Sequence, residues 1–210
     1  MNYNYNKSKN PAFTLAEILI TLSVIGILAS ITMPSLIQNT QEKELRTAFK
    51  KAYSDFAQVT KKVIQDNGGT MVGICLNGDH DCLKNKYIAH LNIIKNCKNG
   101  ESLGICWHDN DGSSKYLRGQ PYTTWGNLAG FILNNGTLVR VWMVDPACKN
   151  QTYSPRGECA NILLDVNGFK KPNTLGKDIF YLHVYEDCIA PWGTSDDDSN
   201  STSRSASCSK

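Results

Sequence analysis

Cysteine and histidine are the residues of this 210-residue chain whose side chains most readily do chemistry. All eight cysteines lie after residue 74, and the closest two have six residues between them. Zinc-binding pairs are separated by roughly two to four residues, so this spacing argues against zinc. An even number of cysteines confined to one part of the chain is instead typical of disulfides formed in an oxidising compartment. Because short loops cost least entropy to close, we expect sequential pairs: Cys75–Cys82, Cys97–Cys106, Cys148–Cys159 and Cys188–Cys208.

The histidines give no indication of catalysis. His80, His90, His108 and His183 are scattered, the serine-rich segments contain no G-x-S-x-G sequence, and there is no P-loop. The stretch WHDNDG, residues 107–112, has alternating acids like the start of an EF-hand, but the glutamate that closes such a loop is missing. We therefore expect a protein that is not an enzyme.

A single carboxylate, that of Glu17, precedes the longest apolar stretch of the chain. The 24 residues from Ile18 to Gln41 carry no charge. As a helix they would reach roughly 36 Å, longer than a bilayer core of about 30 Å. A secretory signal peptide has a shorter apolar run that is followed by a small-residue cleavage site, so this segment fits that class poorly. A plain membrane anchor leaves the acid unexplained, because an ionised carboxylate at the edge of hydrocarbon is costly without a partner.

The sequence AFTLAE that leads into this run resembles the type III signal of type IV pilins and type II secretion pseudopilins. The resemblance covers about residues 7–60, although Ala12 stands where most members have glycine. It implies that a prepilin peptidase cuts between Ala12 and Phe13 and that the new amino group of Phe13 is methylated. It also implies that assembly depends on four residues: Phe13, Glu17, Gly26 and Pro34.

The chain behind the signal predicts an α+β, pilin-like fold. One helix is expected over residues 13–66, and its second half has an apolar stripe at three- and four-residue steps: Leu45, Phe49, Ala52, Phe56, Val59, Val63 and Ile64. Two β-rich runs flank the turn at residues 134–136, and further strands are expected over residues 161–166 and 179–185. We expect a four-stranded antiparallel meander packed on the helix, forming a disulfide-rich head.

Five segments follow from this division. We expect a leader (1–12), the membrane-spanning half of the helix (13–37), its amphipathic half (38–67), a globular head (68–190) and a flexible tail (191–210). Within the head, residues 70–76 are expected to form a short strand and residues 81–96 a second helix.

The loop between the last two predicted strands has two interpretations. It resembles loops of some pseudopilin heads that hold calcium, and Asp165, Asn167 and Asp178 would supply the oxygen ligands. The alternative is a tight loop that needs Gly168, Pro172 and Gly176 for its backbone conformation, and this is the interpretation we prefer. We therefore expect no cofactor, with calcium as the candidate to test.

The resemblance implies a pilin or pseudopilin, a structural subunit polymerised into a type II secretion pseudopilus or a type IV pilus. Its partners would be other pilin-like subunits, the prepilin peptidase, the N-methyltransferase and the inner-membrane assembly platform. The precursor would cross the bacterial inner membrane once with its head in the periplasm, and after assembly it would lie in a periplasmic pseudopilus or an extracellular pilus. The alternative is a membrane-anchored periplasmic enzyme or binding domain that never polymerises.

Nucleic-acid binding is not expected. The net charge of +3 is too small to indicate it. The one hint of a basic, aromatic patch is a short run in the middle of the chain: Lys115, Tyr116, Arg118 and Tyr122.

Overall fold

The computed structural model describes residues 13–123, 126, 128–152 and 156–192. The chain divides into two compact units, one up to Glu42 and the other from Lys43 onward. Helix α1, Leu15–Asp66, is continuous across this division and contributes to both units. The long helix expected over residues 13–66 is therefore confirmed.

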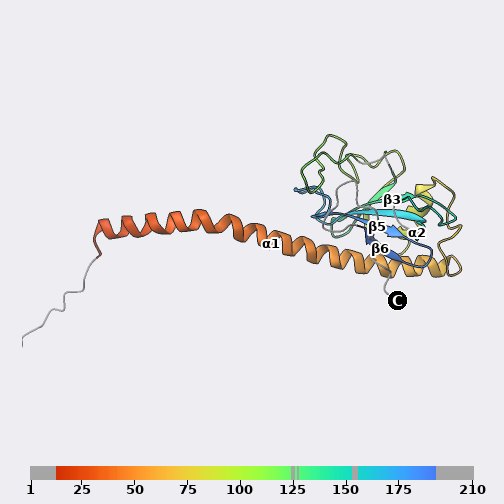
Figure 1. Ribbon diagram of the computed structural model, residues 1–210, viewed down its shortest axis with the longest axis horizontal. Helices are drawn as coiled ribbons and strands as arrows, with labels where there is room; N and C mark the ends of the chain where they lie inside the picture. The colour runs from red at the N-terminus through yellow and green to blue at the C-terminus, as the bar shows by residue number, and fades with distance from the viewer. Residues whose placement is uncertain (1–12, 124–125, 127, 153–155, 193–210) are drawn as a thin grey trace, which may run out of the picture. The chain divides into compact units, whose positions relative to one another are not determined.

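The second unit is built on one antiparallel sheet of six strands that follow one another in chain order. Figure 1 shows this sheet with the part of α1 from Lys43 onward lying along it. The strands are β1 (Ile93–Cys97), β2 (Gly130–Leu133), β3 (Leu138–Met143), β4 (Ala160–Asp165), β5 (Ile179–Val184) and β6 (Ile189–Trp192). Strands β2 to β5 are the predicted meander, with Gly136 at positive φ in the predicted β2–β3 turn.

The prediction of four strands was wrong, because β1 and β6 extend the sheet at its two edges. Strand β6 contains Pro191, which has no N–H to donate and is tolerated only at an edge. Strand β1 lies in the segment expected to be helical up to Asn96, whereas helix α2 covers only His80–Ile88. The helical spacing of Leu83, Tyr87, Leu91 and Ile94 predicts that all four face inward, but Ile94 lies in β1 and is exposed. The strand expected over residues 70–76 is also wrong, since this segment forms turns.

The predicted packing of helix on sheet is confirmed. The apolar stripe of α1 packs on one face of the sheet and forms a single buried core with it. In this core Phe56 has no exposed surface, and its ring stacks with that of Tyr87 in α2. Phe49 stacks on Phe180 at the start of β5, with ring centroids 3.9 Å apart. The hydroxyl groups of Thr60 and Tyr87 lie 2.9 Å apart inside this core, which joins α1 to α2.

Three of the four predicted disulfides are present: Cys75–Cys82, Cys97–Cys106 and Cys148–Cys159. The fourth includes Cys208, which lies outside the described residues. The disulfides close short loops around the sheet, in agreement with the entropy argument for neighbouring pairs.

The other face of the sheet is covered by loops instead of a helix. A second buried core there contains Trp107, Tyr122 and Leu163, and Arg140 lies over the Trp107 ring at 5.7 Å from the ring centroid. Burial lowers the pKa of Arg140 to about 10. These loops bring residues 107–122 against the connection between β4 and β5, where the calcium candidates lie.

Candidate functional site

The start of α1 is closed by a reciprocal pair of hydrogen bonds between Thr14 and Glu17. The Thr14 backbone N–H donates to Glu17 Oε2 at 2.8 Å, and the Thr14 hydroxyl donates to the same oxygen at 2.9 Å. The Glu17 N–H donates in return to Thr14 Oγ1 at 3.2 Å. This is a capping box, in which both residues satisfy N–H groups that a helix leaves without partners. The T-x-x-E sequence is the signature of such a box, whereas Glu17 is predicted above only as a charged assembly residue.

The capping box directs the Glu17 carboxylate back toward the N-terminal end of the helix. Phe13, which immediately precedes Thr14, is 83% exposed. Glu17 Oε1 has no hydrogen-bond partner among the described residues, so it remains available to a donor from outside the helix. Ala12, the other residue of the predicted cleavage site, lies outside the described residues.

The part of α1 that belongs to the first unit has an apolar surface. The helix is long and apolar enough to cross a membrane, as judged by length and composition. Its large side chains are exposed, among them Ile20, Leu22 and Ile31. Its hydroxyl groups donate to carbonyls one turn back, as Ser23 does to Leu19 at 2.8 Å, which satisfies polar groups without water.

Gly26 and Pro34, the other predicted assembly residues, both lie inside α1. A side chain at Gly26 would meet nothing within 4 Å, so packing inside the described chain does not require glycine there. Pro34 has no N–H, so the carbonyl of Ser30 loses its usual helical donor. The fold of the described chain thus does not require glycine at position 26, and the assembly role of Gly26 and Pro34 stays a prediction.

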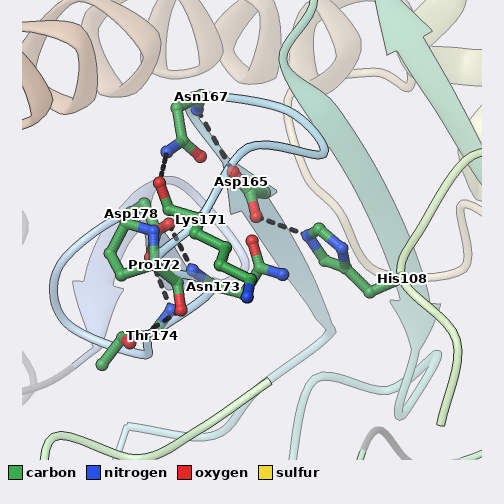
Figure 2. A network of polar contacts seen from close by, with 8 residues as sticks. All are labelled: His108, Asp165, Asn167, Lys171, Pro172, Asn173, Thr174 and Asp178. Atoms are coloured by element: carbon green, nitrogen blue, oxygen red, sulfur yellow. Dashed lines mark hydrogen bonds and ion pairs between the residues drawn. The ribbon is translucent and has the colours of Figure 1, made fainter. Parts of the chain in front are cut away.

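The β4–β5 loop is held together by its own hydrogen bonds, as Figure 2 shows. The two oxygens of buried Asp178 accept from the backbone N–H groups of Asn173 and Thr174 at 2.7 and 2.6 Å. Asn167 donates from its side chain to the Lys171 carbonyl at 3.2 Å. These bonds hold the loop in a compact conformation.

Asp165, at the end of β4, forms a buried pair with His108. His108 Nε2 lies 2.7 Å from Asp165 Oδ2, while Asp165 Oδ1 accepts from the Asn167 N–H at 3.1 Å. Burial raises the pKa of Asp165 to about 6, although the hydrogen bond from His108 acts in the opposite direction. The pair links the outer loop to the end of strand β4 (Figure 2).

The three calcium candidates therefore lie close together, but both carboxylates face donors from the chain itself. In the part of the chain that the structure describes, no group of three or more His, Cys, Asp or Glu side chains is placed to hold a metal ion. Calcium also takes backbone carbonyl and water oxygens as ligands, so both interpretations of this loop stay predictions.

Each histidine is engaged within the fold. The partners, in chain order, are the backbone N–H of Met143 for His80, Asp66 for His90, Asp165 for His108 and Glu158 for His183. Burial also lowers the pKa of His80. The arrangement is structural and brings none of these rings together into a common site.

Comparison with known proteins places the signal at the N-terminus and relates the chain to fimbrial proteins. The prokaryotic N-terminal methylation motif matches residues 7–33. A fimbrial protein of Neisseria meningitidis serogroup A, strain Z2491, is 25% identical over 126 residues, which cover 52% of this chain and 72% of the relative. A fimbrial protein of serogroup B, strain MC58, is 23% identical over 128 residues, which cover 53% and 74%. No solved structure matches. The motif and the relatives thus confirm the resemblance of this chain to the type IV pilin family.

Proposed function

We propose that this chain is the subunit of an open helical filament of the type IV pilus kind, with a type II secretion pseudopilus as the alternative. The two relatives named fimbrial proteins favour the pilus. The precursor is inserted in the inner membrane with its head in the periplasm, cut between Ala12 and Phe13, and methylated at Phe13. The assembly platform then adds it to the filament.

One observation carries this proposal: the Glu17 carboxylate lies at the N-terminal end of an exposed apolar helix and accepts a hydrogen bond from the Thr14 N–H. Helix association in lipid has little hydrophobic drive, so polar contacts select the geometry. Cleavage before Phe13 creates an amino group one residue ahead of the capping box. The Glu17 carboxylate of one subunit then pairs with the Phe13 amine of a neighbour, because two charges away from water require a partner. Repeating this contact with a rotation and a rise produces an open filament.

The test compares Glu17→Gln with Glu17→Ala in a host that has the assembly machinery. Glutamine keeps the oxygen that caps the helix but removes the charge, whereas alanine removes both. We expect Glu17→Gln to enter the membrane as the original chain does and to lose at least ~99% of filament yield. Breaking a buried charge pair costs roughly 3–5 kcal/mol, and about 1.4 kcal/mol is a factor of ten.

Filaments are measured in the sheared fraction and by electron microscopy, and the precursor is measured in the membrane fraction. Glu44→Gln, which removes an exposed carboxylate from the same helix, is the matched control and is expected to assemble normally. Normal filaments from Glu17→Gln together with failure of Glu17→Ala would show that Glu17 acts only as a helix cap and would refute the proposed charge pair.

A further inference from the structure

Two loops that are far apart in the sequence are joined into one surface of the head. The Lys115 N–H donates to the Asn173 carbonyl and the Leu175 N–H donates to the Lys115 carbonyl, each at 2.9 Å. A Cβ at Gly176 would lie 3.1 Å from the Leu117 side chain, so this side chain packs against the Gly176 backbone. We call residues 113–123 and 166–177 together the paired-loop surface.

The paired-loop surface is strongly basic. It contains five exposed cations and no acid: Lys115, Arg118, Lys170, Lys171 and Lys177. The whole chain has a net charge of +3, so the remainder is net negative, at 3 − 5 = −2. Asp178, the acid that follows the second loop, is buried and accepts backbone hydrogen bonds, so its side chain does not reach this surface.

Each loop also exposes an apolar side chain next to a cation. Phe169, beside Lys170, is 51% exposed, and Leu117, beside Arg118, is 40% exposed. The tyrosines of the first loop are not available in this way, because Tyr122 is buried and Tyr116 packs on the same core. Single-stranded nucleic acid is bound by exposed aromatic rings on which successive bases stack. Exposed apolar side chains beside lysines instead match a lipid surface, with phosphates above and acyl chains below.

The position of the second loop within the head agrees with a membrane partner. The loop leads into β5, whose residue Phe180 stacks on Phe49 of α1. The opposite end of the sheet lies at the end of α1, where the Met71 N–H donates to the Glu186 carbonyl. Phe49 follows Gln41, the last residue of the uncharged run, by eight residues. The loop therefore lies at the end of the sheet that the chain reaches first after the apolar segment.

We propose that the paired-loop surface binds the surface of an anionic bilayer and holds the head against the membrane before the subunit is assembled. The inference rests on the proposed insertion of the first part of α1 in the membrane, but it does not depend on polymerisation. The phosphates of anionic lipids pair with the four lysines and Arg118, and Phe169 and Leu117 enter the headgroup region. High salt weakens the contact, since exposed charges are screened within about 10 Å or less.

The test uses the full chain, one copy per lipid nanodisc, in neutral phosphatidylcholine or in discs containing phosphatidylglycerol. Amide hydrogen exchange is followed for residues 113–123 and 166–177, with residues 185–188 at the other end of the sheet as the internal reference. We expect exchange in both loops to be at least threefold slower in the anionic discs, no change at residues 185–188, and loss of the protection in high salt.

Two triple variants test whether the protection depends on the lysines of the paired-loop surface or on exposed lysines in general. Lys170→Gln/Lys171→Gln/Lys177→Gln should abolish the protection, whereas Lys61→Gln/Lys62→Gln/Lys98→Gln, which removes three exposed lysines elsewhere, should retain it. Equal exchange in the two kinds of disc would overturn the proposal. This is the result expected if the surface binds an acidic protein segment instead of lipid. So would duplex DNA that protects the loops in neutral discs, which would make nucleic acid the partner. A single chain in a disc cannot form filaments, so these outcomes are independent of the Glu17 experiment.

Discussion

At the scale of single residues, the Glu17 carboxylate has a structural role, and we propose that it also has a role in assembly. Glu17 caps its own helix through Oε2, and the same geometry directs its charge toward Phe13, the residue that we propose becomes the N-terminus after cleavage. Asp165 is the contrasting case, because it is buried, paired with His108 and bound to the Asn167 N–H. Its role is to hold an outer loop on the sheet, and its environment makes that hold depend on pH.

Replacing Asp165 with asparagine should remove a pH dependence from the stability of the head. The pKa of Asp165 is raised to about 6 by burial, so the folded chain holds a proton that the unfolded chain has released. Stability relative to Asp165→Asn should therefore be highest near pH ~4 and fall as the pH rises to about 6, by up to about 3 kcal/mol. The measurement is the free energy of unfolding by denaturant, in detergent, at a series of pH values.

The exposed Asp55 on α1 supplies the control, since Asp55→Asn should parallel the original chain at every pH. If stability relative to Asp165→Asn instead rose with pH, the Asp165 carboxylate would be stabilised as an anion by its contacts with His108 and the Asn167 N–H. That outcome would contradict the assignment of burial as the dominant influence on Asp165.

At the scale of elements, the turn between β2 and β3 and the loop between β4 and β5 support each other. Gly168 has a φ of +73°, and a Cβ there would lie 2.8 Å from the backbone oxygen of Gly136. The loop thus needs glycine for two reasons: its left-handed conformation and the close approach of a backbone that cannot move aside. Gly119 has a similar φ of +84°, but a Cβ there would meet nothing within 4 Å.

Gly168→Ala should therefore destabilise the head more than Gly119→Ala. The alanine at position 119 costs only the left-handed conformation, about 1–2 kcal/mol. At position 168 the clash with the Gly136 oxygen adds about 1–3 kcal/mol. The two variants are compared by denaturant unfolding followed by tryptophan fluorescence. Equal losses of stability would contradict the close packing of the two turns.

The elements that were predicted correctly are those with long or local patterns. The apolar stripe and the uncharged run define α1, and the Asn-Gly turn defines the β2–β3 hairpin. Strand β1 was not predicted because Leu83, Tyr87, Leu91 and Ile94 have the spacing of one continuous helix. In the structure the helix α2 ends at Ile88 and β1 begins at Ile93. The His108–Asp165 pair joins residues 57 positions apart, and no local pattern indicates such a contact. The Thr14–Glu17 cap, by contrast, could have been predicted from its sequence signature.

At the scale of the whole molecule, two surfaces of the described chain expose side chains suited to contacts with other molecules. The first part of α1 exposes large apolar side chains and is long and apolar enough to cross a membrane. The head exposes a basic surface with Phe169 and Leu117 at its loops. We propose that lipid covers both surfaces in the precursor and that other subunits cover the helix in the filament. In this proposal, removal of the leader commits the chain to the second state, since it would create the amine with which Glu17 pairs.

The mass of the mature N-terminus tests this account most directly. The chain is isolated from cells that contain the prepilin peptidase and its N-terminal peptide is analysed by mass spectrometry. The account predicts a chain that starts at Phe13 with a methylated amino group. A chain that still starts at Met1 in those cells would contradict it, because no amine would then lie beside Glu17.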